Sequence, residues 1–340
     1  MALRGDHPLD RLAELRRWLG AALPDRAPSL EPASADASFR RYFRAVDGPD
    51  TWIIMDAPPE HEDVRPFVRI AGLMLDAGVN APRVLAQDVD RGFLLLTDLG
   101  RTTYLTELQR DPMRAPALFD DAIGALIKWQ LASREDVLPP YDDALLRREL
   151  SLFPEWYLGR HLGLELDARE TAMLDRVFDR LLANILAQPR VFVHRDFMPR
   201  NLMVSEPDPG VLDFQDAVYG PISYDIASLM RDAFISWPEE LSLDWTVRYW
   251  ERARAAGLPV DPDFGTFYRD VDWMGMQRHL KVLGIFARLH HRDGKAGYLE
   301  DTPRFLHYVR GVAGRYTELA PLIPLLDRIE GRVSETGYTF

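Results

Sequence analysis

The stretch FVHRDFMPRN, residues 192–201, places polar side chains that can do chemistry directly after an apolar run. Asp196 and Asn201 are separated by only four residues, and Asp213 follows a little further along the chain. Between Asn201 and Asp213, the segment SEPDPG at 205–210 has the composition of a turn. The spacing therefore suggests that distant positions of the chain are brought back together here.

A hairpin would explain this spacing. If residues 202–204 pair with residues 211–212, the residue that enters the first strand and the residue that leaves the second lie opposite each other. Asn201 and Asp213 would then share one end of the hairpin, and the preceding loop would deliver Asp196 beside them. Two carboxylates in one place repel each other, and placing them together with an amide oxygen also costs free energy of desolvation. A cation bound between these groups would offset both costs.

Magnesium prefers oxygen ligands, and in nucleotide sites it is shared between one or two carboxylates and the phosphates. A carboxylate left off the metal can orient a hydroxyl group and accept its proton during phosphoryl transfer. The pattern therefore predicts Mg2+ at Asn201 and Asp213 and a general base at Asp196. Taken singly, these residues have ordinary structural explanations, as turn formers or a strand-ending cap, and His194 as a packing side chain.

Composition limits the possible partners. The chain has 340 residues, of which 47% are hydrophobic, enough for one large or two unequal domains. Its 41 basic and 53 acidic residues give a net charge of −12, the wrong sign for a nucleic-acid partner. The absence of cysteine excludes disulfides, thiolate metal sites and cysteine nucleophiles.

The sequence has no long apolar segment and no signal-peptide pattern, so we expect a cytoplasmic protein without a membrane partner. No protein partner is implied.

Hydrophobic periodicity predicts an α+β fold with a small N-lobe over residues 1–99 and a large C-lobe over residues 100–340. In the N-lobe, an antiparallel sheet and two helices are expected, with a helix before Gly20, strands at 39–46, 52–56, 84–89 and 93–96, and a helix at 63–77. The C-lobe is expected to be mainly helical, with helices at 115–132, 142–160, 168–187, 224–234, 241–256 and 264–290. A cleft between two such lobes is a favoured ligand site.

The residues HRD at 194–196, Asn201 and DF at 213–214 resemble the catalytic and metal-binding loops of the protein-kinase-like fold. The continuation VLDFQDAVYGPISYDIA at 211–227 resembles more specifically the aminoglycoside phosphotransferase family of small-molecule kinases. This resemblance implies a two-lobed kinase fold, ATP as co-substrate, Asp196 as the base, and Mg2+ on Asn201 and Asp213. It also implies that His194 and Asp225 support the site, the latter from a helix that braces it.

The N-lobe departs from the kinase pattern. Met55 stands where kinases of this fold generally carry a phosphate-binding lysine, and the loop PASADASFRR has no glycine. Phosphate charge still needs an opposing charge, so the candidate nucleotide-binding residues are Ser38, Arg40, Arg41 and Arg44. In a strand, Arg40 and Arg44 share one face and Arg41 lies on the other. The side chains of only one of these faces can therefore point into the cleft. A solvated edge strand would explain these arginines equally well.

The segment FLLLTDLG at 93–100 resembles the family's connection between the lobes, where backbone groups meet adenine. Leu96, Asp98 and Leu99 are the candidate contacts. A buried strand that ends in a turn would have the same sequence, and the two explanations are compatible.

The segments at 38–44, 54–59 and 277–289 resemble a branch of the family, the bacterial sugar kinases of cell-wall recycling. Members of that branch phosphorylate the anomeric hydroxyl of N-acetylmuramate and N-acetylglucosamine, and Met55 falls inside one of these segments. A sugar-binding pocket needs aromatic faces and, for the lactyl carboxylate of N-acetylmuramate, a cation. The substrate-binding candidates are Trp156, Tyr157, Arg278 and Lys281, which could equally be core aromatics and helix-surface charges.

Two alternatives remain open from the sequence. A polycationic aminoglycoside, or another small alcohol, would be attracted by the charge of −12, although salt screens that attraction within about 10 Å. A catalytically silent nucleotide-binding pseudokinase is suggested by Met55 and the loop without glycine, but Asp196, Asn201 and Asp213 are all present.

Overall fold

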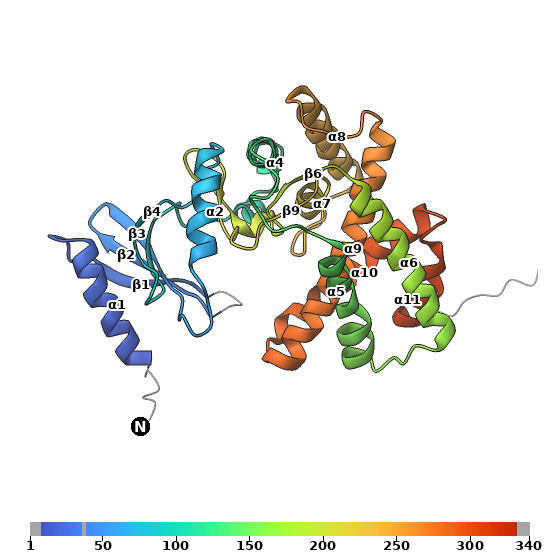
Figure 1. Ribbon diagram of the computed structural model, residues 1–340, viewed down its shortest axis with the longest axis horizontal. Coiled ribbons are helices and arrows are strands. Elements are labelled where there is room, and N and C mark those ends of the chain that lie inside the picture. Colours follow the sequence, from blue (N-terminus) through green and yellow to red (C-terminus); the bar gives the residue numbers. More distant parts are fainter. Residues whose placement is uncertain (1–7, 36–38, 332–340) are drawn as a thin grey trace, which may run out of the picture. The chain divides into compact units, whose positions relative to one another are not determined.

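The computed structural model describes residues 8–35 and 39–331 (Figure 1). The chain divides into two compact units. Unit 1 comprises the chain up to Arg114 together with the later segment Asn201–Asp216. Unit 2 comprises Ala115–Arg200 and the chain from Ala217 onward. Both units carry the elements that a kinase-like fold requires, a small antiparallel sheet in unit 1 and a mainly helical unit 2. The predicted division into lobes after residue 99 stays a prediction.

Unit 1 is built on one antiparallel sheet with the strand order β1-β2-β3-β5-β4. Its strands are β1 Ser29–Ala35, β2 Arg41–Asp47, β3 Asp50–Asp56, β4 Val84–Asp88 and β5 Phe93–Thr97. Four of the five were predicted from alternation. β1 was missed because its sequence, SLEPASA, lacks alternation and contains Pro32, which an edge strand with a register shift tolerates.

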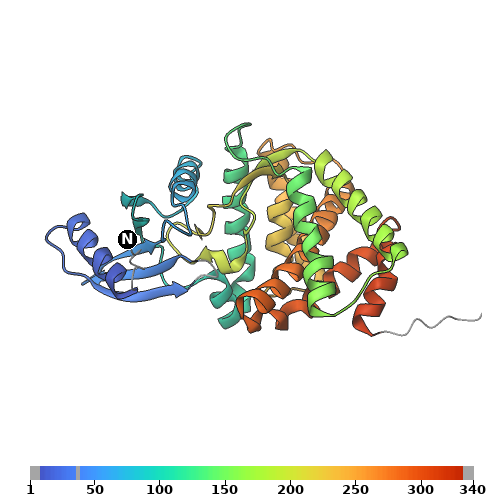
Figure 2. The same cartoon turned by 60° about the horizontal axis from the view of Figure 1, so that its bottom comes forward.

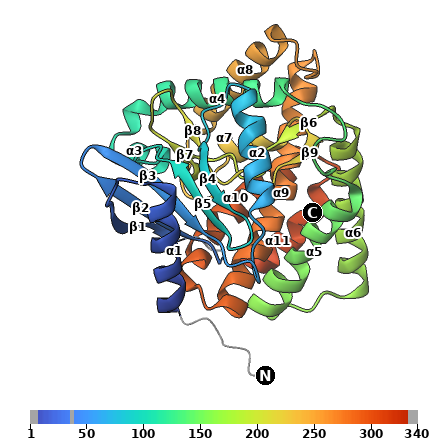
Figure 3. The same cartoon turned by 60° about the vertical axis from the view of Figure 1, so that its left-hand side comes forward.

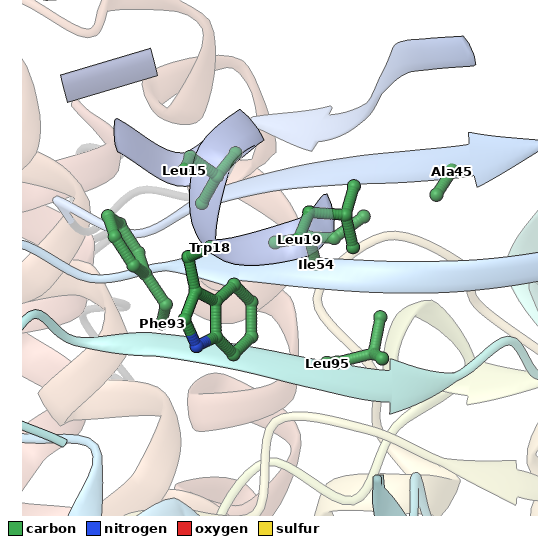
Figure 4. Packing of buried hydrophobic residues seen from close by; sticks show 7 residues of the cluster. All are labelled: Leu15, Trp18, Leu19, Ala45, Ile54, Phe93 and Leu95. Atoms are coloured by element: carbon green, nitrogen blue, oxygen red, sulfur yellow. The ribbon is translucent and has the colours of Figure 1, made fainter. Parts of the chain in front are cut away.

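Helix α1, Pro8–Ala22, covers one face of this sheet. Its side chains Leu15, Trp18 and Leu19 join a buried cluster with residues of the central strands (Figure 4), namely Ala45, Ile54, Phe93 and Leu95. Since side chains alternate along a strand, neighbouring positions such as Met55 lie on the opposite face. Helix α2, Arg65–Asp76, lies on the other side of the sheet from α1 in Figure 1.

The returning segment of unit 1 is a short hairpin of β7, Leu202–Met203, and β8, Gly210–Val211. Several contacts fasten it to the rest of unit 1. β7 lies beside α3, Tyr104–Arg110 (Figure 3), the Val204 N–H donates to the carbonyl of Thr102 at 2.9 Å, and Asn80 Nδ2 donates to the carbonyl of Pro207 at 2.7 Å. Phe214 follows the hairpin closely, and its ring packs at a tilt against that of Phe67 in α2, with the ring centroids 4.7 Å apart.

Unit 2 is a helical assembly arranged around α9 (Figure 2). Its α-helices are α4 Ala115–Leu131, α5 Asp143–Leu152, α6 Ala168–Ala187, α7 Tyr224–Met230, α8 Glu239–Ala255, α9 Phe264–Asp293, α10 Thr302–Arg315 and α11 Ile323–Glu330. A two-stranded ribbon of β6, Arg190–Val193, and β9, Val218–Pro221, precedes α7. α9 packs against α5, α6, α7 and α10 and so joins these helices into one core.

The predicted helix over 142–160 is two elements in the structure. α5 ends at Leu152 and a π-helix, Phe153–His161, follows it, with Pro154 in its first turn. At this junction α9 comes very close, because a Cβ on Gly284 would lie 2.4 Å from the carbonyl carbon of Leu152. Glycine is therefore required where the two elements cross. The predicted helix 224–234 ends earlier than expected, at Met230.

Among the described helices, none combines the length and the apolar character that a membrane span requires.

Candidate active site

The hairpin β7–β8 brings the two predicted metal ligands together within unit 1. Leu202 pairs with Val211, and the amide of Leu212 donates to the carbonyl of Asn201 at 2.9 Å. Asn201 therefore lies opposite Leu212, one residue out of the predicted register. Asp213 is next along the chain, and Asn201 Nδ2 lies 3.4 Å from its Oδ2. The predicted hairpin is thus confirmed, whereas its predicted register, with Asn201 opposite Asp213, is wrong by one residue.

The backbone of Asp213 has φ of 62°, a conformation that few non-glycine residues adopt. Phe214 fixes this turn, because its side chain is fully buried against Phe67. The carboxylate accepts a hydrogen bond from Gln215 Nε2 at 2.8 Å, and Arg40 Nη2 lies 3.6 Å from its Oδ1. Strained backbone at a charged side chain is common at ligand sites.

These two side chains fit magnesium. One carboxylate and one amide oxygen are a typical protein share of a magnesium site in which a nucleotide supplies further oxygens. No three His, Cys, Asp or Glu side chains form a cage for a metal in the parts of the chain that the structure describes. The donor set therefore suits a metal that arrives with a nucleotide better than one held by protein alone.

The three candidate arginines of β2 and its approach have different partners. Arg41 forms an ion pair with the buried carboxylate of Asp56, which also accepts from Arg11 Nε of α1 at 2.7 Å. Arg44 makes a two-pronged pair with Asp98, at 2.6 and 3.1 Å, and donates to the carbonyl of Gly100 at 2.7 Å. Arg40 reaches Asp213.

The candidate hinge residues follow β5. Leu96 is buried, and its strand is paired on both sides, with Ile53 of β3 and Val84 of β4. Burial would raise the pKa of Asp98, but Arg44 and the amide of Gly100 hold that pKa below its usual value. Leu99 lies against Gly210 of the hairpin, since a Cβ on that glycine would be 2.9 Å from its side chain. Adenine contacts at Leu96, Asp98 and Leu99 stay a prediction, and Ser38 lies outside the described residues.

In unit 2, Asp225 holds the backbone that leads to Asp196. The Asp225 side chain, fully buried at the start of α7, accepts from the amides of His194 at 2.7 Å and Arg195 at 3.0 Å. The amide of Asp196 donates to Nδ1 of the buried His194 at 3.2 Å. Burial raises the pKa of Asp225 to about 7, although the two amide donors favour the ionised carboxylate. His194 and Asp225 thus both brace the segment that carries the predicted base.

A buried charge network lies beneath this segment, centred on Glu149 of α5. Its carboxylate is 2.5 Å from Arg195 Nη2 and 3.7 Å from Lys281 Nζ, and it accepts from the hydroxyl of Tyr141. Lys281 also donates to the hydroxyl of Tyr224 at 2.6 Å. Burial would raise the pKa of Glu149, but Lys281 and Arg195 hold it below its usual value. The network fixes Arg195, whose φ is 80°, next to Asp196 in the chain.

Sequence reasoning missed Glu149, although a signal existed. It lies three residues after Leu146 and four before Phe153, on the apolar face of its helix. A carboxylate at such a position requires a buried cation as partner. The sequence does not show which cation that is.

The remaining substrate-binding candidates are distributed over unit 2. Arg278 of α9 is 1% exposed, and its Nη2 lies 3.9 Å from the sulfur of Met198, two residues after Asp196. Trp156 of the π-helix is partly buried, with Arg160 over its ring. Tyr157 lies in the core, stacked on Phe153. Sugar contacts at these residues and at Lys281 stay predictions.

Asp196 belongs to unit 2, whereas Asn201 and Asp213 belong to unit 1. The structure therefore describes the metal-ligand pair and the braced base segment separately, and their convergence on one substrate stays a prediction.

The small antiparallel sheet, the mainly helical second unit and the loops just described define a kinase-like phosphotransferase fold. Solved structures with this fold include choline kinase LicA from Streptococcus pneumoniae, with a TM-score of 0.61 at 14% identity, covering 89% of this chain and 99% of that one. The gentamicin complex of APH(2")-IIa matches with a TM-score of 0.58 at 15% identity, covering 90% and 97%. Identities this low show the fold alone.

Residues 29–259 match the model of the phosphotransferase enzyme family, APH, and the chain belongs to that family. It is a phosphotransferase that acts on an alcohol group. Among its relatives, the N-acetylmuramate/N-acetylglucosamine kinase of Pseudomonas aeruginosa is 54% identical, covering 93% of this chain and 96% of that protein. The Neisseria meningitidis protein of the same name is 52% identical over 98% of this chain and all of that protein.

Proposed function

We propose that the protein transfers the γ-phosphoryl group of ATP to the anomeric hydroxyl of N-acetylmuramate, N-acetylglucosamine or both. The observation that carries this proposal is the identity of 54% and 52% with two kinases named for these sugars, over more than nine-tenths of the chain. The segments that resemble this branch include the region around Met55, so we expect the branch to lack the lysine as well. Because ATP and these sugars meet in the cytoplasm, we place the protein there.

In the proposed reaction, Asn201 and Asp213 would hold Mg2+, which would neutralise charge on the phosphates of ATP. The Asp196 carboxylate orients the anomeric hydroxyl and accepts its proton as the oxygen attacks the γ-phosphorus, while ADP leaves with the former bridging oxygen. Asp225 and His194 act on Asp196 through the backbone, by fixing the segment that carries it. The adenine is bound beside the residues from Leu96 to Leu99.

The acceptor is proposed to lie against unit 2, where Arg278 and Lys281 are close to the segment of Asp196. Each is buried, and Lys281 is already bound to Tyr224 and close to Glu149. Lys281 therefore acts on the acceptor mainly through this network, whereas Arg278 is the better candidate for a direct contact with the lactyl carboxylate. Trp156 is the better candidate of the two aromatics for a sugar face, because Tyr157 is in the core.

The test is ADP release from MgATP with N-acetylmuramate, N-acetylglucosamine, kanamycin and choline as acceptors. We expect turnover with the sugars only. Turnover with kanamycin alone would establish the aminoglycoside alternative, and no turnover with any acceptor, while MgATP binds, would support a pseudokinase. A methyl glycoside, whose anomeric oxygen is blocked, is expected to be inert, and its phosphorylation would move the reaction to another hydroxyl.

A further inference from the structure

Unit 1 lacks the side chain that kinases of this fold generally use to bind the α and β phosphates. Met55 of β3 occupies the position of that lysine, fully buried between Tyr42 of β2 and Leu94 of β5. No lysine occurs in residues 1–127 or 201–216, which include all of unit 1. Besides Mg2+, arginine is therefore the side chain of this unit best suited to oppose the charge of a bound triphosphate.

The pleat of the sheet excludes Arg41 from this role. Arg41 pairs across the strands with Asp56, so the two side chains lie on the same face of the sheet. That face is the one covered by α1, from which Arg11 also reaches Asp56. Met55 points to the opposite face. Arg41 thus neutralises a buried carboxylate on the side of the sheet away from Met55.

Arg44 lies on the face of Met55 but is held elsewhere. It is opposite Ile53, two residues before Met55 on β3. Its guanidinium makes two hydrogen bonds to Asp98 and one to the carbonyl of Gly100, and the side chains of both Arg44 and Asp98 are less than one-tenth exposed. Such a two-pronged buried pair positions the end of β5. Removing Arg44 from it would leave a buried carboxylate uncompensated.

Arg40 is directed to the hairpin instead. Its Nη2 lies 3.6 Å from Oδ1 of Asp213, the carboxylate next to Asn201, and its side chain is one-tenth exposed. A guanidinium at this position is within reach of any phosphate oxygen that shares a cation with Asp213. A triphosphate with bound magnesium would suit both Arg40 and Asp213, because the carboxylate of Asp213 can bind the cation and the guanidinium of Arg40 can bind a phosphate.

We propose that Arg40 is the phosphate-binding cation of this protein and replaces the third-strand lysine from a different strand. This inference rests on the proposed function insofar as ATP is the phosphoryl donor, and it is independent of the identity of the acceptor. The substrate group that Arg40 recognises is the phosphate chain of a nucleoside triphosphate, at the oxygens nearest to a Mg2+ ion held by Asp213. Arg41 and Arg44 are structural.

The test measures equilibrium binding of MgATP and of adenosine by calorimetry, without any sugar. Arg40→Met is expected to weaken MgATP binding by about tenfold or more, the value of a charge-assisted hydrogen bond, and to leave adenosine binding unchanged. Arg40→Lys should restore part of the loss. The matched control is Arg26→Met, because Arg26 is also ion-paired, with Asp47 and Asp50 at the other end of the β2–β3 hairpin.

Adenosine binding shows that each variant is folded at the nucleotide site. Wild-type affinity for MgATP in Arg40→Met would overturn the proposal, as would an equal loss for MgATP and adenosine. If Arg40→Met does not fold, Arg40→Gln, which keeps a hydrogen-bond donor without the charge, is measured in its place with the same two outcomes. A wrong acceptor assignment would appear differently, as a wild-type protein that binds MgATP normally but does not phosphorylate either sugar.

Discussion

The replacement of Glu149 by glutamine tests whether the buried network stabilises the segment before Asp196. The substitution keeps the size of the side chain and its ability to accept from Tyr141, but it removes the charge. Arg195 and Lys281 would then face each other's positive charge in a site where their side chains are 21% and 7% exposed. The change therefore isolates the electrostatic part of the network.

The expected loss follows from the burial of the two cations. Removing one partner of a buried ion pair lowers the free energy of unfolding by about 3–5 kcal/mol, because the other charge stays buried without compensation. Arg195 keeps some contact with solvent, so we expect about 3 kcal/mol, a large part of the total for a typical protein. Since the pKa of Glu149 in the fold lies below its usual value of 4.5, this stabilisation is complete above pH 4.5 and is lost as the pH falls through the lower value.

Urea unfolding followed by tryptophan fluorescence is the assay. Of the eight tryptophans, all but Trp18 and Trp52 belong to unit 2, so the signal reports mainly on the unit that contains Glu149. The matched control is Glu155→Gln, an exposed carboxylate in the adjoining π-helix, for which a change within about 0.5 kcal/mol is expected. A loss below about 1 kcal/mol in Glu149→Gln would refute the reasoning, as would simple additivity with Lys281→Met in a double-mutant cycle.

Three further outcomes are expected. Asp196→Asn should abolish ADP release and leave calorimetric MgATP affinity largely intact, because the base does not hold the nucleotide; wild-type rates would refute its role. His279 is buried and its pKa lies well below 6.5, so it stays neutral in the fold while the unfolded chain gains a proton below pH 6.5. As the pH drops below 6.5, the wild type should therefore lose stability relative to His279→Gln by about 1.4 kcal/mol per pH unit, and the comparison cancels the contribution of Asp225, whose raised pKa acts in the opposite direction. Gly284→Ala should lower that free energy by about 1–3 kcal/mol through its clash with Leu152, whereas Gly311→Ala, a helical glycine with open space around it, should raise it; equal effects would contradict the packing argument.

The sequence predicted most elements of the fold because their signals are local. α6 was predicted with its observed bounds, since it carries a regular apolar stripe and begins after Asp167, which forms a capping box with Glu170. The π-helix after α5 was not predicted, because the residues from Phe153 onward continue a helical pattern and only the packing of α9 distinguishes the two helix types. β9 was missed for a similar reason: VYGP contains glycine and proline and is a strand only because it pairs with β6.

In the candidate site, too, the features that depend on local sequence could be predicted and those that depend on distant segments could not. The meeting of Asn201 and Asp213 could be predicted because it depends on one short turn. The network around Glu149 could not, because its members Tyr141, Arg195, Tyr224 and Lys281 come from four separate segments. Arg40, Arg41 and Arg44 each pair with a carboxylate that is distant in the sequence. The sequence does not predict which carboxylate pairs with which arginine.

The return of Asn201–Asp216 to unit 1 has a consequence for synthesis on the ribosome. The first part of unit 1 ends at Arg114, and the strands β7 and β8 that complete it are translated roughly a hundred residues later, about 5–20 s at common elongation rates. During this interval Phe67 has no Phe214 to cover it. The nascent sheet can form early, but the proposed nucleotide-binding surface of unit 1 is finished only after about two-fifths of the helical unit has been made. A chaperone that binds exposed aromatic side chains could bind Phe67 during this interval.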